Sequence, residues 1–433
     1  MDSHNIFTDD VKLTPYWWDK TPRPHIVSTE LPAQVDVAVI GSGYTGLNAA
    51  LVTARAGRST IVFDAEDAGY GCSTRNGGQI STSIKPELEP LARKHGAETA
   101  FNIIRQGHDA LQWIEEFVNE EGIECDFRVC GRFHAAHNKR QFNQLAEQTK
   151  HQPKGLEVPC HVVTRAEQHQ ELHTDAYHGG VVFENHASLD PASYHQGLLS
   201  RAISAGAQIQ PQCAVQNITA TGQGYKLTTH HGEVHATDVI VATNGYTGKL
   251  TPWLRRRVIP IGSYIIATEA LEKDVMDRLM PHDRIYSDTC KVVYYYRASP
   301  DRSRILFGGR VSSAETDPIK SAPRLKSDLD RLFPELKSTR VSHSWMGFVA
   351  YTFDTLAHQG QHKGIHYAMG YCGSGVSMAS YLGMHTGQRV VGHSPPANSL
   401  ESIGFPTRPL YTGRPWFLPA TVAWYRFKDR LER

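Results

Sequence analysis

The sequence predicts an α/β fold of two domains, one organised around a buried parallel sheet and the other around a mixed sheet. Residues 35–64 have the pattern of a strand, a glycine-rich turn, a helix and a second strand, and residues 366–391 repeat the order of strand, glycine turn and helix. Residues 253–344 instead alternate apolar and polar side chains, which is typical of antiparallel strands. The chain therefore combines a Rossmann-like unit with a discontinuous mixed-sheet domain.

Composition limits the classes of protein to which the chain can belong. At 433 residues it is long enough for more than one domain and for sizeable cores. The formal net charge of +1 gives no sign of nucleic-acid binding or of attachment to a membrane. No apolar run is long enough to span a bilayer, and the polar start lacks the apolar core of a signal peptide. The seven cysteines form no C-x-x-C pair, so we expect a cytoplasmic protein without a metal site or disulfides.

Residues 35–64 predict a dinucleotide site. A β-branched run begins at Val35 and suits a buried parallel strand. The G-x-G-x-x-G motif follows, and its glycines allow a tight turn, approach of the backbone to a pyrophosphate and close packing of the helix. The second strand ends at Asp64, where a carboxylate accepts hydrogen bonds from a ribose hydroxyl. We expect the cofactor to contact Gly41, Gly43, Tyr44, Thr45, Gly46, Asp64 and Ala65.

Three further segments supply candidate cofactor contacts. The loop RNGGQ brings backbone N–H groups close to a flat ligand such as a flavin, and the alternative is a solvent-exposed turn. The strand VIVA runs into a turn of small residues that passes the nucleotide or is simply the end of a buried strand. The segment GYCGSG opens a helix whose N-terminus would stabilise a reduced flavin, or it is an ordinary helix cap. The candidates are Thr74, Arg75, Asn76, Gly77, Gly78 and Gln79; Val215, Thr243, Asn244 and Gly245; and Tyr371, Gly373, Ser374, Gly375 and Val376.

Together these motifs resemble the D-amino-acid-oxidase-like family of FAD-dependent amine oxidoreductases, and most of all its gamma-glutamylputrescine oxidoreductase group. The likeness rests on Trp17-Trp18 and on VIGSGYTGLNAAL, GYGCSTRNGGQ, VATNGYT, ILFGGR and GYCGSGV, and it covers most of residues 15–392. It implies a Rossmann-like FAD-binding domain and a discontinuous, mixed-sheet substrate domain. It also implies hydride transfer from an amine carbon to flavin N5, followed by hydrolysis of the imine.

The resemblance and the element pattern imply a division of the chain. Residues 1–34 form an extended arm whose aromatic side chains pack on the body, and its prolines disfavour a helix. Residues 396–433 form a loop-rich tail. The FAD-binding domain comprises residues 35–85, 155–250 and 345–395, and the substrate domain comprises residues 86–154 and 251–344.

Five residues are candidates for the substrate side of the flavin. Lys291 lies near the place where sarcosine oxidases carry a lysine that helps O2 react with reduced flavin, and the alternative is a surface lysine. Tyr296, or the tyrosine two residues before it, is expected to cover the substrate. Arg310 could bind a carboxylate bidentately or form a surface ion pair. His343 could accept the amine proton or be an ordinary buried histidine, and Trp345 could wall the pocket.

The predicted function is FAD-dependent oxidative deamination of an amine, either a gamma-glutamyl-polyamine-like or an N-substituted amino compound, with electrons passed to O2. Non-covalent FAD is expected, because residues 349–352 lack the cysteine through which sarcosine oxidases attach flavin. The alternatives are a quinone- or dye-linked D-amino-acid dehydrogenase, a flavin monooxygenase and a catalytically inactive flavin-binding subunit. A monooxygenase would need NAD(P)H, for which the sequence has no second G-x-G-x-x-G motif. The sequence leaves the oligomeric state open.

Overall fold

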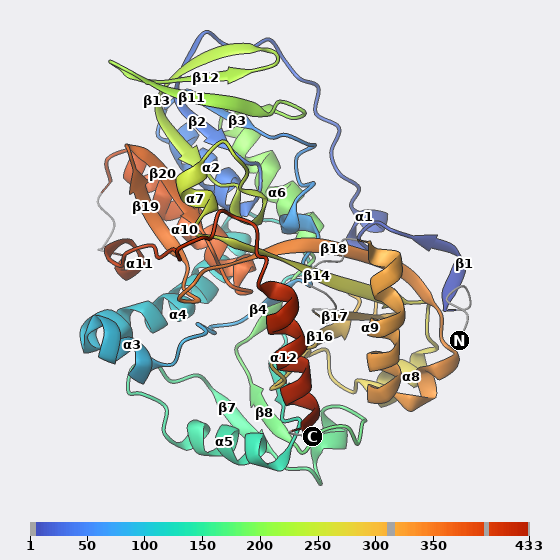
Figure 1. The fold of residues 1–433 in the computed structure, drawn as a ribbon. Helices are drawn as coiled ribbons and strands as arrows, with labels where there is room; N and C mark the ends of the chain where they lie inside the picture. The colour runs from blue at the N-terminus through green and yellow to red at the C-terminus, as the bar shows by residue number, and fades with distance from the viewer. Residues whose placement is uncertain (1–5, 310–316, 394–397, 432–433) are drawn as a thin grey trace.

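Two large β-sheets form the framework of the molecule. The structure, a computed structural model, describes residues 6–309, 317–393 and 398–431. In Figure 1 one sheet lies toward the top of the view, the other extends across the lower half from β1 at the right to β7 and β8, and the C-terminal helix lies in front of this second sheet. Segments from the start, the middle and the end of the chain contribute to both sheets.

The first sheet has eight strands and a parallel centre. Its five neighbouring strands β10, β3, β2, β13 and β20 run parallel, with Val39 aligned with Val62 on one side and Ile240 on the other. The central parts of β2, β3 and β13 are apolar and buried because side chains pack on both faces of the sheet. In chain order the strands are β2 (Gln34–Ile40), β3 (Thr60–Phe63), β10 (Gln208–Gln210), β11 (Val215–Thr221), β12 (Gly224–Thr229), β13 (Gly232–Val241), β19 (His358–His362) and β20 (Ile365–Met369).

Helices α2, α4, α6 and α10 pack together over this sheet. Leu47, Tyr194 and Leu382 on three of them are buried in one core with Val37 and Val39 of β2. Asp190 caps the start of α6, and its carboxylate accepts hydrogen bonds from the first free N–H groups of the helix. The helices are α2 (Tyr44–Arg55), α3 (Leu88–His95), α4 (Ala97–Glu120), α6 (Pro191–Ser204) and α10 (Gly375–Val390).

The second sheet has nine strands, and helices α8 and α9 cover one of its faces (Figure 1). Buried residues of α9 at Ala322, Leu325, Leu329 and Leu332 repeat every three or four positions, which turns one stripe of the helix onto the sheet. The strands, in their spatial order, are β1 (Phe7–Lys12), β18 (Val341–Tyr351), β14 (Ile259–Thr268), β17 (Ile305–Gly309), β16 (Tyr295–Ala298), β15 (Ile285–Asp288), β6 (Arg132–Ala135), β8 (Gly180–Phe183) and β7 (Cys160–Val163), and the helices are α8 (Lys273–Leu279) and α9 (Pro318–Leu332).

The remaining elements complete the described chain. A three-stranded sheet joins the end of the RNGGQ loop to two later segments. These elements are β4 (Gln79–Ile80), β5 (Arg128–Val129), β9 (Ala187–Ser188), α1 (Trp17–Lys20), α5 (Lys139–Lys150), α7 (Pro252–Arg255), α11 (Ser399–Ser402), α12 (Leu418–Leu431), and the 3-10 helices η2 (Cys72–Thr74), η3 (Gln168–Gln170), η4 (Asn244–Tyr246) and η5 (Pro334–Ser338).

Sheet membership does not follow the predicted domain segments everywhere. Strands β7 and β8 fall within residues 155–250 and β1 falls within the arm, yet all three belong to the nine-stranded sheet. Strand β18 crosses the boundary at residue 345 and belongs to that sheet over its whole length. Alternation in the sequence identifies strands but not their partners, because strands of either sheet share the same period. The domain boundaries therefore remain a prediction.

Helices also occur in the arm and the tail, where the sequence predicts none. In the arm, α1 is a single turn, and Pro15 and Pro22 flank it rather than interrupt it. In the tail, α12 has Pro419 at its second position, where a missing N–H costs no hydrogen bond within the helix. Pro15, Pro22 and Pro419 are therefore compatible with these helices.

Candidate cofactor and substrate site

Two glycines shape the turn between β2 and α2. Gly41 has a φ of +108°, and a Cβ atom there would lie 3.0 Å from the carbonyl oxygen of Ala242. A Cβ atom at Gly46 would lie 1.9 Å from the carbonyl oxygen of Gly41, so the first turn of α2 packs directly on the loop. This places the N-terminus of α2 at the carboxyl end of β2, which is the position that binds phosphates in dinucleotide folds.

Asp64 closes the same turn from the end of β3. Its Oδ2 atom accepts hydrogen bonds from the backbone N–H of Ser42 (2.9 Å) and from the Ser42 hydroxyl, and Oδ1 accepts one from the N–H of Glu66 (3.0 Å). The residue is half-buried and a carboxylate has about four lone-pair sites, so acceptor capacity remains on its exposed side. Ala65, next to it, is exposed.

The middle and C-terminal cofactor segments meet this turn. The hydroxyl of Thr45 on α2 lies 2.6 Å from that of Tyr371, just before α10. The side-chain oxygen of Asn244 accepts a hydrogen bond from the N–H of Gly370 (2.9 Å). The starts of α2, η4 and α10 are therefore neighbours, although about 200 or more residues separate the first from the others. Predicted residues in these three segments are Gly41, Gly43, Tyr44, Thr45 and Gly46; Thr243, Asn244 and Gly245; and Tyr371, Gly373, Ser374, Gly375 and Val376.

Val215 lies apart from these contacts. It begins β11 and is buried in the core that also contains Phe63 of β3, on the opposite side of β2 from α2. Val215 nevertheless lies near the end of β3, where the sequence predicts that the nucleotide half of the cofactor binds.

Asn76 fixes the shape of the RNGGQ loop. Its side-chain amide donates hydrogen bonds to the carbonyl oxygens of Cys72 (3.1 Å) and Ser73 (3.0 Å). Its side-chain oxygen accepts a hydrogen bond from the N–H of Gly78 (2.8 Å). One side chain thus ties both ends of the loop together, and the Gln79 amide anchors the loop to β16 through the carbonyl oxygen of Tyr296 (3.0 Å).

Three tryptophans hold the loop through their indole N–H groups. Two come from the arm and the third from β18, so the arm and the nine-stranded sheet together support the loop. The donor–acceptor pairs are Trp17 to the Asn76 carbonyl (2.9 Å), Trp18 to the Thr74 hydroxyl (3.0 Å) and Trp345 to the Arg75 carbonyl (2.9 Å).

The Arg75 side chain takes part in the contact with the arm. Its guanidinium carbon lies 4.8 Å from the ring centre of Trp18 and 4.7 Å from that of Tyr70, and Nε donates to the Tyr70 carbonyl (2.7 Å). Burial lowers the pKa of Arg75. The guanidinium therefore braces the loop against the arm.

The four substrate-side candidates that lie in the described residues are not brought together at one place. Trp345 is fully buried and touches the RNGGQ loop, whereas Tyr296 is buried in the core between the sheet and α9. Nε2 of His343 lies 3.1 Å from the carboxylate of Asp19 in the arm, and burial lowers the pKa of this histidine. His343 is therefore part of the contact between β18 and the arm.

Lys291 lies apart from the other described candidates. Lys291 is exposed in the loop before β16, and its ammonium lies 6.0 Å from the ring centre of Tyr425 in α12. This position resembles the surface-lysine alternative more than a buried cation. Arg310 lies outside the described residues.

Tyr295, which the sequence does not single out, faces the loop. A Cβ atom at Gly77 would lie 3.2 Å from its ring, and its hydroxyl lies 2.8 Å from that of Ser263. Because side chains alternate along β16, Tyr295 faces the RNGGQ loop and Tyr296 faces α9. Alternation is visible in the sequence, but which face meets the cofactor is not.

A cation and an aromatic ring flank the start of α10. The ammonium of Lys85 lies 5.4 Å from the ring centre of Tyr351, and a Cβ atom at Gly373 would lie 3.7 Å from the Tyr351 hydroxyl and 3.8 Å from Cε of Lys85. The hydroxyl of Ser374 holds this segment by donating to the Ser83 carbonyl (2.7 Å). Lys85 adds positive charge at the positive end of the α10 dipole, which favours an anionic group here.

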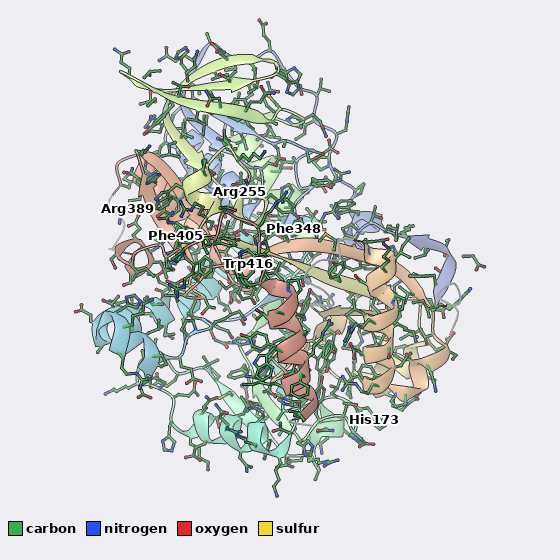
Figure 2. The ribbon with its side chains drawn as sticks, viewed as in Figure 1. His173, Arg255, Phe348, Arg389, Phe405 and Trp416 are labelled. Carbon is green, nitrogen blue, oxygen red and sulfur yellow. The ribbon has the colours of Figure 1, made fainter. Side chains whose placement is uncertain are left out.

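Two aromatic side chains stand between η4 and β18. The ring of Phe348 meets that of Tyr246 edge-on, with 5.5 Å between centres, and Figure 2 shows Phe348 near the middle of the view. Gly245 packs against the backbone of Phe348, where a Cβ atom would lie 2.9 Å from the carbonyl oxygen. These contacts join η4, a candidate cofactor segment, to the nine-stranded sheet.

Cys72 and Cys372 lie close to these segments as protonated thiols. Burial raises the pKa of each to about 11. A thiol with so high a pKa is a poor nucleophile at neutral pH, because the thiolate is the reactive form. This supports the expectation of non-covalent FAD.

Neither a metal site nor a membrane span is found in the part of the chain that the structure describes. No group of three or more His, Cys, Asp or Glu side chains in residues 6–309, 317–393 and 398–431 is placed to hold a metal ion. Within the same residues, no helix combines the length and the apolar character needed to cross a bilayer.

Comparison with known proteins identifies the family. Residues 36–389 match the model of the DAO family, described as FAD dependent oxidoreductase. The chain belongs to this family. As a DAO-family member it is an FAD-dependent oxidoreductase, and its cofactor is FAD.

Relatives of the chain match over most of its length. It is 29% identical to the gamma-glutamylputrescine oxidoreductase of Escherichia coli, over 92% of this chain and 93% of the relative. It is also 29% identical to the probable oxidoreductase OrdL of Haemophilus influenzae, over 91% and 92%. The glycine oxidase of Geobacillus kaustophilus has the same fold, with a TM-score of 0.72, 18% identity and coverage of 86% of this chain and all of that one. The DAO-type pair of sheets predicted from the sequence is confirmed.

The residues present fit FAD. The glycine turn at Gly41 and Gly46 has no room for a Cβ atom, and Asp64 at the end of β3 keeps acceptor capacity for a ribose. The starts of α2 and α10 supply two positive helix ends close together, which suits a cofactor that carries a pyrophosphate and becomes anionic when reduced.

Proposed function

We propose that this DAO-family enzyme oxidises an amine, either a gamma-glutamyl-polyamine-like or an N-substituted amino compound, to an imine that water hydrolyses, and that O2 accepts the electrons. The observation that supports it most is the junction of α2, η4, α10 and the RNGGQ loop, the segments that carry the likeness to gamma-glutamylputrescine oxidoreductase. Oxidoreductase activity is shared by the family, whereas the proposed amine substrate rests on the likeness to gamma-glutamylputrescine oxidoreductase.

Bound FAD would supply the acceptor for a hydride from the amine carbon. The chain's own residues would hold the two reactants in line. Asn76 and the three tryptophans fix the RNGGQ loop, and Tyr295 packs on Gly77 from the side of the nine-stranded sheet. A rigid frame of this kind aligns donor and acceptor without a covalent step.

Lys85 and Tyr351 would orient the substrate. The aromatic ring can pack on the carbon chain of an amine, and the ammonium can attract a carboxylate elsewhere in the same molecule. This favours substrates that carry a carboxylate as well as an amine, as gamma-glutamyl amines and N-substituted amino acids do.

An anaerobic screen of flavin bleaching tests the proposal. The holoenzyme is mixed with polyamines, gamma-glutamyl amines, N-methyl amino acids and D-amino acids, and the loss of oxidised-flavin absorbance is followed. We expect the carboxylate-bearing secondary amines or gamma-glutamyl amines to bleach the flavin fastest, and simple polyamines to react slowly. Lys85→Met should raise KM for those substrates more than it lowers kcat, whereas Lys154→Met, an exposed lysine in the loop between α5 and β7, should change neither.

The alternative functions give different results. Bleaching by D-amino acids alone, with dye reduction but no H2O2 on admission of air, would identify a quinone- or dye-linked dehydrogenase. Bleaching by NADPH would identify a monooxygenase. A flavin that no amine reduces would identify a binding subunit and contradict the proposal.

A further inference from the structure

Helix α12 presents an aromatic face to solvent. Trp424 and Phe427 are each 53% exposed and Leu431 is 70% exposed. They recur at intervals of three and four residues, so they share one side of the helix. The rings of Trp424 and Phe427 stack with 5.9 Å between centres. Trp416, just before the helix, is also exposed, at 70%, and is labelled in Figure 2.

The opposite side of α12 is firmly attached to the body. Leu418 is buried in a core with Tyr351, and Val422 packs against that core. The buried carboxylate of Asp429 accepts hydrogen bonds from the backbone N–H groups of Lys291 (2.9 Å) and Val292 (3.0 Å). One side of the helix is therefore fixed to the body of the protein. The aromatic side is exposed although the helix is packed in place. In Figure 1 it lies at the front of the molecule.

The segment that ends in this helix is strongly basic. Residues 402–433 contain six Lys or Arg and two Asp or Glu, in a chain whose net charge is only +1. One of the two carboxylates, Asp429, is turned inward. The ammonium of Lys428 lies 5.4 Å from the ring centre of Trp424, so a cation borders the exposed rings.

We propose that α12 docks the enzyme on an anionic phospholipid surface. Exposed Trp, Phe and Leu side chains bordered by a lysine, in a basic segment, are typical of helices that lie in the bilayer interface. The basic charge complements anionic headgroups, which attract clustered Lys and Arg near a membrane. A second copy of the chain fits less well, because a symmetric contact would bring two basic helices together. The docking is peripheral: α12 lies flat and the rest of the chain stays outside the bilayer.

Vesicle sedimentation with the full-length holoenzyme tests this docking. The probes are vesicles of phosphatidylcholine alone and vesicles of phosphatidylcholine mixed with phosphatidylglycerol. We expect the mixed vesicles to pellet the protein at least about tenfold better at low salt, and we expect added salt to remove most of this difference. Tryptophan fluorescence should shift to the blue only with the mixed vesicles.

Two variants locate the binding on α12. The triple variant Trp424→Ser, Phe427→Ser and Leu431→Ser should lose most of the pelleting, and Lys428→Glu should weaken it severalfold. The matched control carries Val129→Ser and Ile203→Ser, which remove exposed apolar side chains elsewhere, and should pellet like the parent. Retention of the flavin spectrum shows that each variant is folded.

Several outcomes would overturn the docking. These are equal pelleting with both kinds of vesicle, no pelleting, or a triple variant that pellets like the parent. A concentration-dependent dimer that forms without vesicles and disappears in the triple variant would assign the face to a second copy. The vesicle test does not involve an amine, so a failure of the proposed function would leave it unaffected.

Discussion

At the level of single residues, Asn76 is the centre of the RNGGQ loop. Its three hydrogen bonds to Cys72, Ser73 and Gly78 close the loop on itself. Each of these bonds contributes about 1 kcal/mol to the stability of the loop conformation, so Asn76→Ala should destabilise that conformation by about 2–3 kcal/mol. If FAD binds only this conformation, its affinity should fall about 30- to 150-fold. Titration of the apoprotein with FAD measures the effect.

The control for this prediction is Asn217→Ala. Asn217 is exposed on β11, where it bonds only a neighbouring threonine among the contacts described, and its replacement should leave FAD affinity unchanged. If the Asn76 and Asn217 variants bind FAD equally well, the loop does not depend on the asparagine and is fixed by the tryptophans.

A buried histidine should make the fold sensitive to acid. His385 on α10 packs edge-on against Tyr381, and burial, helped by the positive charge of Arg389, lowers its pKa to about 4. The unfolded chain takes up a proton near pH 6.5, before the folded chain does, so stability falls as the pH drops from 6.5 towards 4. The loss between pH 7 and pH 5 should be about 1–2 kcal/mol from this residue.

Urea unfolding at the two pH values measures this loss. His385→Gln cannot protonate, so its stability should fall less between pH 7 and pH 5 than that of the parent. His393→Gln replaces an exposed histidine and should keep the full dependence of the parent. An unchanged pH dependence in His385→Gln would show that other groups cause the acid sensitivity.

The sequence predicts cofactor residues on firmer physical grounds than substrate residues. Glycines such as Gly41 and Gly46 are required by the backbone itself, so a motif records them. A substrate side chain is defined by the face of a strand, and Tyr295 and Tyr296 differ only in that face. The sequence shows Trp17 only as an aromatic residue in the arm. Its hydrogen bond to the Asn76 carbonyl cannot be predicted, because the two residues lie 59 positions apart in the chain.

At the level of elements, the crossing of α2 and α10 sets the position of both helix N-termini. A Cβ atom at Gly383 would lie 2.5 Å from the carbonyl oxygen of Thr45 and 2.8 Å from its Cα atom. Alanine gains up to about 1 kcal/mol over glycine inside a helix, whereas overpacking costs about 1–3 kcal/mol. Because the opposing atoms are backbone, they cannot rotate away, and the clash should outweigh the gain.

Gly383→Ala should therefore lower stability by about 1–2 kcal/mol and weaken FAD binding, because it separates the two helix starts. Urea unfolding and FAD titration measure the two effects. Gly248→Ala is the matched control, since a Cβ atom there meets nothing within 4 Å. A Gly383→Ala variant as stable as the Gly248→Ala variant would show that the helices can part without cost.

Element types are more predictable than element partners. The strand–turn–helix units at β2–α2 and β20–α10 follow directly from sequence periodicity. The placement of β7 and β8 in the nine-stranded sheet does not, because hydrogen bonds between strands leave no trace in the period. The sequence does not predict helix α12, because Pro419 suggests a loop. The position of Pro419 in the first helical turn is, however, compatible with a helix.

At the level of the whole molecule, the cofactor region joins distant parts of the chain. Contacts such as Thr45 to Tyr371 and Asn244 to Gly370 connect the first, middle and last thirds of the sequence. The arm adds a further link, because Trp17 and Trp18 reach the RNGGQ loop while β1 pairs with β18. Binding of FAD should therefore stabilise the fold as a whole and not one segment of it.

Removal of FAD measures this coupling. A ligand that binds only the folded chain at 100 times its Kd stabilises it by about 2.7 kcal/mol. With an unfolding entropy of about 2.1 cal/mol/K per residue, a chain of 433 residues should lose about 3 °C in its apparent unfolding midpoint on going from that FAD concentration to the apoprotein. FAD added back should restore the midpoint. FMN should restore little of it, because FMN lacks the adenosine half that the Gly41–Asp64 unit is expected to hold. A midpoint that FMN restores as fully as FAD would show that the flavin half alone organises the chain, and that the dinucleotide unit contributes no binding energy.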